Sequence, residues 1–361
     1  MKSFVTQVCA SVAASALALP AVAQSCLGDI AIDNRIDGGD LGVMLANWGP
    51  VTSTALSRAC DLDGNAIVNG ADLGLVLSAW GPCPPPAIPA WAVLIESQPD
   101  PTVVTDQTLR EAISATGLAW RVRDTRTQIE MLLVPPGTFQ MGCSPSTSYS
   151  CSSWEGPVRL VTITNPFYLG RFEVTQSEWT AEMGSNPSYF QAPQFPGSGD
   201  RPVDAVSWDM TQGFMQRTSM RLPTEAEWEF AYRAGSTKAF HSFPGMPNGT
   251  NDDHTWVIDQ IAWYHGNTWG TKPVGLKASN ALGFHDMSGN AWEWVNDWFA
   301  MSYPATAEIN PLGPASGIAR VMRGGGPNTP IGWLRSSFRN DVSPGNSSSD
   351  YGFGFRVAKN P

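Results

Sequence analysis

Oxygen-bearing side chains in residues 61–72 follow the spacing of a calcium-binding loop. They stand at positions 1, 3, 5, 9 and 12 of the stretch, and the residue at position 7 would donate its backbone carbonyl. In chain order, with the position 7 residue included, they are Asp61, Asp63, Asn65, Ile67, Asn69 and Asp72. The spacing predicts a calcium site, whereas the simpler alternative is a solvated turn rich in Asp and Asn.

A weaker copy of this pattern precedes it, because residues 29–49 and 61–81 repeat with a period of 32 residues. The candidate ligands of the first copy are Asp29, Asp33, Asp37 and Asp40. Position 3 of this copy is Ala31, whose side chain has no oxygen to offer. The sequence therefore leaves open whether the first copy holds calcium.

A second set of candidate ligands lies in the Trp-rich stretch 280–298. Asp286 and Glu293 could hold a hard cation, together with carbonyls of the turn that contains Gly289. Alternatively, the two carboxylates only accept hydrogen bonds from turn amides, and the residues alone do not decide between these readings.

Three further side chains are candidates for a pocket. His285 adjoins one of the acidic residues of this stretch, although a single histidine in a loop is usually structural or exposed. Arg335 and Arg339 are the other two candidates, and structural ion pairs are the simpler explanation for both.

The spacing of two of the six cysteines predicts a disulfide. Cys143 and Cys151 bracket a Ser-rich loop, where a structural disulfide is favoured over a reactive thiol. The pairing of the remaining cysteines outside the N-terminal apolar segment stays open, and these are Cys26, Cys60 and Cys83.

The first 23 residues have the pattern of a secretory signal peptide. Lys2 precedes a short apolar stretch, and the small residues of 21–23 suit cleavage. The stretch is too short for a membrane anchor, which needs about 18 apolar residues. No later segment has the composition to span a bilayer, so we expect a secreted protein, extracellular or periplasmic.

Composition narrows the fold and the function. The 361 residues include 22 basic and 32 acidic side chains, which gives a formal net charge of −10. This charge and the lack of a basic cluster argue against nucleic-acid binding. With 35 Gly, 29 Pro and 15 Trp, the chain suits neither a helical bundle nor a disordered protein.

The chain divides into four segments. Residues 1–23 are the signal peptide, 24–83 the calcium-loop repeats, 84–90 a stiff proline-rich linker and 91–361 the main domain. Strands are predicted in the main domain at residues 131–134, 138–141, 158–163 and 167–174, and the second of these shows the alternation of a half-buried strand.

Helix starts are predicted from capping residues. The predicted N-caps of the main domain are Thr108, Ser177, Ser207 and Thr224. The last is the clearest, because Glu227 completes a capping box and Trp228 and Ala231 share a core-facing side. We interpret the nearby acidic residues as capping and helix-dipole groups, in preference to acid–base catalysts. In the second repeat a helix should follow from Asp72, and its predicted apolar face comprises Leu73, Val76, Leu77 and Trp80.

The paired loops in residues 26–83 resemble a type I dockerin. Dockerins are calcium-loop and helix repeats that bind cohesin modules of scaffolds or cell surfaces. The resemblance implies calcium ions in the loops and a cohesin-like partner for this small α unit.

The main domain resembles the formylglycine-generating enzyme family, also called sulfatase-modifying-factor domains. The matching stretches are 136–142, 173–175, 202–208, 221–229, 283–294, 323–325 and 354–356. The resemblance implies an α+β fold similar to a C-type lectin domain, with much irregular loop. It also implies calcium ligation by the side chains of Asp286 and Glu293 and by the carbonyls of Gly289 and Ala291.

Members of this family use copper(I), held by two cysteines, to convert a sulfatase cysteine to formylglycine. The serine and the two cysteines of that motif correspond here to Gly326, Thr329 and Leu334, and no cysteine follows Cys151. Copper(I) requires soft ligands, so copper binding is not expected. We expect an extracellular binding or accessory domain for a glycan or protein ligand. The alternatives are a formylglycine-generating oxidase and a non-copper oxidoreductase that uses the same groove.

Overall fold

The computed structural model of the protein describes residues 29–31, 35–52, 54–82, 85–144, 148–246, 253–347 and 352–361. The predicted signal peptide lies outside these ranges, as do Cys26, Asp33 and Cys83. Within the described ranges, no helix combines the length and apolar character that crossing a membrane requires.

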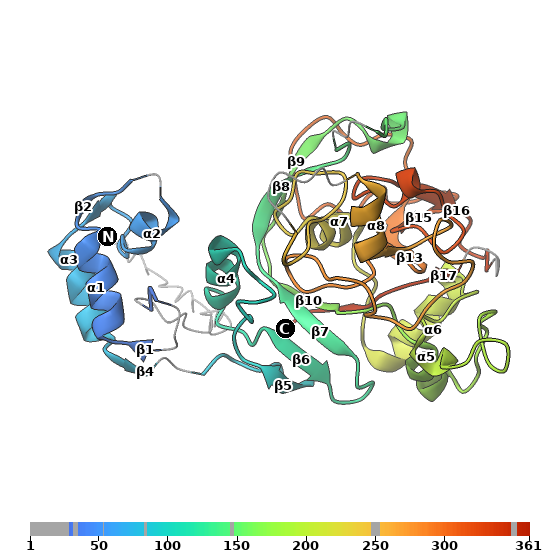
Figure 1. Ribbon diagram of the computed structural model, residues 1–361, viewed down its shortest axis with the longest axis horizontal. Helices are drawn as coiled ribbons and strands as arrows, with labels where there is room; N and C mark the ends of the chain where they lie inside the picture. The colour runs from blue at the N-terminus through green and yellow to red at the C-terminus, as the bar shows by residue number, and fades with distance from the viewer. Residues whose placement is uncertain are drawn as a thin grey trace, which may run out of the picture.

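Residues 35–82 form a small unit, drawn in blue in Figure 1. Its helices are α1 (Gly38–Ala46), α2 (Ala55–Ala59) and α3 (Gly70–Ser78), and its strands are β1 (Arg35–Ile36), β2 (Gly49–Pro50), β3 (Ile67–Val68) and β4 (Gly81–Pro82). β1 pairs with β4 and β2 with β3, both antiparallel. Each repeat therefore supplies one strand to each pair, and backbone hydrogen bonds tie the two copies together.

Both long helices of this unit begin with a capping box. Asp37 caps α1 and Asn69 caps α3, while Asp40 and Asp72 at the N3 positions accept a hydrogen bond from the backbone amide of the cap. The helix predicted from Asp72 is present, although it begins two residues earlier because Asn69 is the cap. The repeats thus use the same residues to start a helix and to supply candidate ligands.

The predicted apolar face of α3 is wrong in part. Val76 is buried and Leu73 packs against the core of the small unit, whereas Leu77 and Trp80 are about half exposed. The core lies on one side of α3, where the helix contacts α1, and these two side chains lie outside it.

The main domain is built around a five-stranded antiparallel sheet in the order β18-β10-β7-β6-β5. Its strands are β5 (Ala92–Glu96), β6 (Arg121–Asp124), β7 (Glu130–Val134), β10 (Phe167–Gly170) and β18 (Ala358–Lys359). The strand predicted at 131–134 is confirmed, but the one predicted at 167–174 ends at Gly170. After Gly170, the backbone amide of Val174 bonds to the carbonyl of Phe355, so the chain leaves the sheet for another partner.

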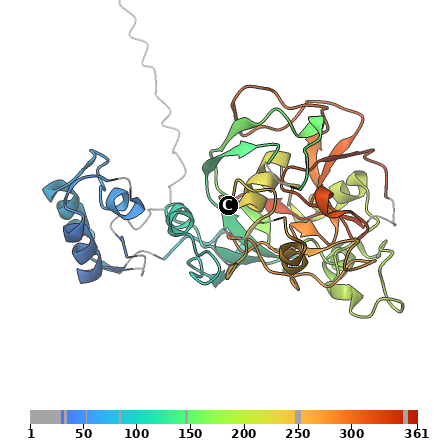
Figure 2. The same ribbon diagram turned by 45° about the horizontal axis from the view of Figure 1, so that its top comes forward.

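Two smaller sheets complete the domain. One has the order β14-β9-β8, with β8 (Gly137–Met141), β9 (Arg159–Ile163) and β14 (Glu308–Ile309), and it contains two predicted strands. The other has the order β16-β15-β13-β17, with β13 (Trp292–Trp298), β15 (Arg320–Arg323), β16 (Asn340–Val342) and β17 (Phe353–Gly354). A short parallel pair joins β11 (Ala262–Trp263) to β12 (Ser288–Gly289). Figure 2 shows long loops between these elements.

In the described part of the main domain, five α-helices pack around the sheets: α4 (Gln107–Ser114), α5 (Gln176–Met183), α6 (Trp208–Thr218), α7 (Glu225–Arg233) and α8 (Thr255–Ile261). The caps predicted at Ser207 and Thr224 are confirmed. Those predicted at Thr108 and Ser177 are wrong, because Asp106 and Thr175 accept the capping hydrogen bonds instead. The fold is therefore mixed α and β, as expected for the main domain.

Candidate functional site

The second calcium loop brings three carboxylates together. One oxygen each of Asp61, Asp63 and Asp72 lie within 4.8 Å of one another, a cluster found nowhere else in the described part of the chain. Asp61 also accepts hydrogen bonds from the amides of Asn65 and Ala66, at 3.0 and 2.9 Å, which close the loop. Three neighbouring negative charges repel one another unless a cation joins them, so the donor set fits calcium.

The remaining predicted ligands lie on the same loop and hold its shape. Asn65 Oδ1 accepts a hydrogen bond from the amide of Ile67 at 2.8 Å. Asn69 donates to the carbonyl of Ile67 at 2.9 Å and accepts from the amide of Ala71 at 2.7 Å. The oxygens at positions 5, 7 and 9 are thus part of the turn that leads into α3.

The first repeat is similar but carries a competing cation. The amide of Ala31 donates a hydrogen bond to Asp40 at 2.8 Å. The residue that corresponds to Ala31 in the second repeat is Asp63, which has a carboxylate. Arg35 Nε lies 3.6 Å from Asp37 Oδ2, whereas the second copy has Ile67 in place of this arginine. Asp29 is also within the described residues. A missing ligand and a nearby guanidinium both weaken cation binding here.

In the main domain, four buried glutamates are each paired with a buried arginine. The pairs are Glu155–Arg335, Glu225–Arg339, Glu229–Arg233 and Glu293–Arg356, with N···O distances of 2.6–2.7 Å. Arg323 bridges two of these glutamates, Glu225 at 3.1 Å and Glu229 at 2.5 Å. Arg335 and Arg339 therefore act as structural ion-pair partners in this fold. So do all three glutamates of α7, since the remaining one, Glu227, pairs with Arg221 at 2.6 Å.

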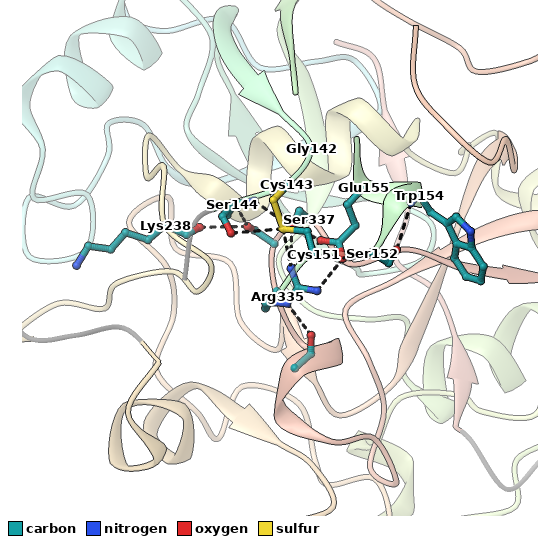
Figure 3. The surroundings of a disulfide bond; sticks show 12 residues. Gly142, Cys143, Ser144, Cys151, Ser152, Trp154, Glu155, Lys238, Arg335 and Ser337 are labelled. Carbon is teal, nitrogen blue, oxygen red and sulfur yellow. Dashed lines mark hydrogen bonds and ion pairs between the residues drawn. A yellow bond between two sulfur atoms is a disulfide. The ribbon is translucent and has the colours of Figure 1, made fainter. Parts of the chain in front are cut away.

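The predicted disulfide Cys143–Cys151 lies beside one of these pairs (Figure 3). Its Cα atoms are 5.7 Å apart. Arg335 Nη1 is 3.6 Å from Cys151 Sγ and 2.7 Å from Glu155 Oε2, and Ser337 Oγ donates to the same carboxylate oxygen at 2.6 Å. The disulfide thus anchors its loop next to the buried ion pair.

A second group of carboxylates in the main domain has too little positive charge around it. Glu173, Asp286 and Glu293 are all buried, and Arg356 is the guanidinium that pairs with Glu293. Glu173 Oε2 and Asp286 Oδ1 have no hydrogen-bond partner within the described residues. The other oxygen of each carboxylate accepts one hydrogen bond from a backbone amide. Glu173 Oε1 accepts from Ala291 at 3.2 Å, and Asp286 Oδ2 accepts from Gly275 at 2.7 Å.

Burial and nearby negative charges disfavour ionisation of Glu173 and Asp286. Burial, then the charges of Asp286 and Glu293, raise the pKa of Glu173 well above its ordinary value. Burial also raises the pKa of Asp286. A divalent cation at the two orphaned oxygens would supply the missing positive charge, and the oxygen-rich donor set suits calcium. Of the other predicted ligands, Gly289 and Ala291 are buried, whereas both carboxylate oxygens of Glu293 already accept hydrogen bonds from Arg356, each at 2.6 Å.

Glu173 is the residue of this group that sequence reasoning missed as a candidate ligand. It lies more than a hundred positions before Asp286 in the chain. The one available signal was its place in a stretch that matches the family.

His285 is held in a neutral form beside this group. Burial is the main reason that the pKa of His285 falls to about 4, with nearby guanidinium groups adding to the effect. Its Nδ1 lies 2.7 Å from the carbonyl of Lys277, which assigns the proton to Nδ1, and Arg171 then donates to Nε2 at 3.4 Å. Both ring nitrogens are therefore engaged in structural contacts.

The structure brings Thr329 and Leu334, the positions expected to correspond to the cysteine pair, together around one glycine. A Cβ atom built on Gly325, whose φ is +81°, would lie 2.4 Å from Leu334 Cδ2 and 3.1 Å from Thr329 Oγ1. The Thr329 hydroxyl accepts a hydrogen bond from the Gly326 amide at 2.7 Å, and Leu334 is fully buried. A bonded hydroxyl and an alkyl group are not copper(I) ligands, so these residues do not fit copper.

Comparisons with known proteins agree with this architecture. Residues 103–361 match the family described as sulfatase-modifying factor enzyme 1-like domain. The chain is 30% identical over 251 residues to the formylglycine-generating enzyme of Thermomonospora curvata, which covers 54% of this chain and 81% of that protein. It is 27% identical over 282 residues to the chaperone protein LppX of Paenibacillus barcinonensis, covering 55% and 91%.

Among solved structures, PvdO from Pseudomonas aeruginosa is similar, with 26% identity and a TM-score of 0.56. This match covers 67% of the present chain and 98% of PvdO. Together with the family match over residues 103–361, it shows that the chain belongs to the sulfatase-modifying factor family of formylglycine-generating-enzyme-like proteins.

Proposed function

We propose that this protein is an exported ligand-binding or accessory member of its family, and that it does not generate formylglycine. The observation that carries this proposal is the filling of the two thiolate positions. Leu334 packs in a small apolar core with Phe240, Ile261 and Tyr264, and Thr329 bonds to the backbone at Gly326. Neither side chain offers the soft donor that copper(I) needs.

The proposal also assigns calcium to the protein as its structural cation. One site is the second loop of the repeat unit, where the convergence of Asp61, Asp63 and Asp72 supports it. The other is the interior of the main domain, where the unpartnered oxygens of Glu173 and Asp286 support it. Calcium at these places would neutralise carboxylates and stiffen loops, and no catalytic step is assigned to it.

The repeat unit is proposed to attach the main domain to a cohesin-like scaffold outside the cell. The reciprocal strand pairs β1–β4 and β2–β3 support this, because they hold two calcium-loop repeats as one compact unit. The main domain would then display its ligand-binding surface to an extracellular glycan or protein. A mature N-terminus at Gln24 in the exported protein, read by intact mass, is the expected sign of export.

The decisive experiment compares the natural chain with a variant in which the thiol pair is restored. The full-length protein and the double variant Thr329→Cys/Leu334→Cys are each titrated with copper(I) against a chromogenic chelator. They are then supplied with O₂ and a sulfatase-type cysteine peptide, whose mass is measured. We expect no copper(I) retention and an unchanged peptide for the natural chain, and copper retention for the variant, because both positions border Gly325.

Conversion of the peptide cysteine to an aldehyde by the natural chain would overturn the proposal. A normal unfolding transition for both proteins serves as the control that each is folded. If the restored variant is folded yet retains no copper(I), the geometric correspondence of Thr329 and Leu334 to the family's cysteine pair is wrong.

A further inference from the structure

Four aromatic rings from two separate loops form one cluster on the main domain. Tyr189, Phe190 and Phe195 come from residues 187–195, and Trp269 comes from residues 264–270. Ring centroids lie 5.1 Å apart for Tyr189–Phe190, 5.2 Å for Phe190–Phe195 and 5.1 Å for Phe195–Trp269. Two members, Phe190 and Phe195, are buried, whereas Trp269 is 68% exposed and Tyr189 is 50% exposed. The buried pair thus forms a base from which two rings reach solvent.

Hydrogen bonds fix the loop that carries Tyr189. The buried carboxylate of Asp204 accepts from the amides of Tyr189 and Phe190, at 2.8 and 3.3 Å. Gln176 donates to the carbonyl of Phe190 at 3.0 Å. These contacts come from buried residues outside the loop, so they hold the rings in place before any ligand arrives.

The second loop is shaped to meet the first. A Cβ atom at Gly270 would lie 2.8 Å from the Phe190 ring, so a residue without a side chain is required for the two loops to touch. The carbonyl of Gly270 accepts a hydrogen bond from the Thr268 hydroxyl at 2.7 Å. The backbone on either side of Trp269 is therefore constrained, and its ring is presented to solvent on a defined support.

A hollow of about 390 Å³ lies beside the exposed Tyr189 ring. It is lined by Pro187, Ser188, Tyr189, Gln191, Ala192, Pro193 and Gln194. The side-chain amides of Gln191 and Gln194 make no hydrogen bond with any described residue, so they are available to a ligand. An aromatic ring next to uncharged donors and acceptors suits a molecule with both C–H faces and hydroxyl groups.

Charge distinguishes between classes of ligand. Neither 187–195 nor 264–270 contains a lysine or arginine, and the whole chain has a formal net charge of −10. The guanidinium of Arg201 packs 5.4 Å from the Phe195 ring centroid, but this side chain is buried under the cluster. A sulfated or otherwise anionic polymer would find no exposed lysine or arginine on these two loops and would be repelled at long range. The surface area that two exposed rings offer is also far smaller than the roughly 800 Å² that each partner buries in a stable protein interface. Pyranose rings match the site, because their C–H faces stack on aromatic rings and their hydroxyls bond to amides.

We propose that the cluster of Tyr189, Phe190, Phe195 and Trp269 is a binding platform for a neutral oligosaccharide. This inference rests on the proposed ligand-binding function and names its site and ligand class. Trp269 and Tyr189 stack on sugar rings, and Gln191 and Gln194 hydrogen-bond to sugar hydroxyls. Phe190 and Phe195 support the two exposed rings from below.

The test is affinity electrophoresis of the full-length protein in gels that contain a mixed-linkage β-glucan, an arabinoxylan, a galactomannan or heparin. We expect retardation by at least one neutral polymer and none by heparin. Isothermal titration with a hexasaccharide of the retarding polymer then gives affinities for the natural chain and for Trp269→Ala and Tyr189→Ala. Each variant should lose about tenfold or more, which is typical of an aromatic anchor.

Two matched controls make the result specific. Trp256→Ala removes a tryptophan that is 47% exposed and outside the cluster, and it should bind normally. Trp333→Ala removes a 45% exposed ring next to Leu334, at the family's catalytic position. If the saccharide binds and only Trp333→Ala weakens it, the ligand-binding function stands and the platform is wrong. If no neutral polymer retards the natural chain, or if heparin alone does, the platform is likewise overturned.

Discussion

The repeat unit and the main domain place their carboxylates in opposite electrostatic settings. Asp61 and Asp63 lie at the surface with Asp72 below them, and no ion pair reaches them within the described residues. In the main domain, by contrast, Glu155 and Glu225 are buried and each meets an arginine at 2.6–2.7 Å. The same chain therefore contains acidic clusters without an arginine partner and buried acidic residues that are paired with arginine.

A candidate cation site is thus distinguished from a structural network by whether an arginine lies beside the carboxylates. The acidic pattern in the sequence does not distinguish the two. A buried glutamate with its own arginine already has its charge balanced without a metal ion, as Glu293 has from Arg356. Glu173 and Asp286 are the intermediate case, since they are buried like the network but keep unpartnered oxygens like a cation site.

The largest effect should come from breaking a buried pair. Arg335→Leu leaves Glu155 charged and buried without its partner, and we expect a loss of about 3–5 kcal/mol in the free energy of unfolding of the main domain. Denaturant titration of the full chain measures it. The double variant Arg335→Leu/Glu155→Leu should recover most of the loss.

Asp61→Asn without calcium should change stability by much less, because that carboxylate lies near the surface. Equal losses for both regions would refute the distinction.

Calcium should stabilise the repeat unit through the second loop. At a concentration one hundred times the dissociation constant, binding adds about 2.7 kcal/mol to the free energy of unfolding. Asp63→Ala should abolish this gain, since it removes the ligand that the first repeat lacks. Ala31→Asp is the reciprocal change and should strengthen binding in the first repeat. Titration calorimetry of the full chain measures both, and unchanged binding in Asp63→Ala would contradict the assigned ligand set.

Asp297 should make the main domain less stable as pH rises. Burial, followed by repulsion from Glu225, raises the pKa of Asp297 from 3.8 to about 8. Between these values the unfolded chain loses the proton that the folded chain keeps, so the free energy of unfolding falls as pH increases. Asp297→Asn keeps an acceptor for the amide of Glu225, now bonded at 2.8 Å, and should remove this slope. We expect a difference of about 2 kcal/mol across the window, moderated by relaxation of the interior. Parallel pH profiles for the two proteins would contradict the assignment.

The smallest effects concern two capping boxes of the same type. Thr224→Ala and Asn69→Ala each remove the acceptor at a helix start, in α7 and α3 respectively, and each should cost about 1 kcal/mol without calcium. With calcium present, Asn69→Ala should cost more, because this residue is also a candidate ligand, whereas Thr224→Ala should be unaffected by the ion. Thermal unfolding with and without a chelator distinguishes the two. A calcium-independent loss for Asn69→Ala would leave it a cap only.

Local patterns in the sequence predicted local structure well. The capping box of Thr224 and Glu227 and the disulfide Cys143–Cys151 are present as predicted. Caps failed at Thr108 and Ser177 because an acceptor two residues earlier serves each helix. Several polar residues in a row compete for a cap, and the tertiary position of the helix start selects one.

Amphipathic patterns were less reliable where little packs against a helix. Leu77 and Trp80 look like core residues by spacing, yet both are half exposed in the small repeat unit. A unit of this size has too little interior to cover every apolar side chain of its helices. The sequence did not predict the role of Trp269 in the aromatic cluster, because its neighbours there lie some 80 residues away in the chain.

Three features follow from the sequence alone, because each depends only on residue identity at fixed positions: the calcium-loop spacing, the stretches that match the family, and the lack of any cysteine after Cys151. Only the tertiary structure decided that Arg335 and Arg339 belong to ion pairs, that Glu173 joins Asp286, and that two loops share one aromatic cluster. These facts depend on which charges and rings meet across long stretches of chain. Residue type sets what a side chain can do, but the free energy of using it depends on neighbours that only folding supplies.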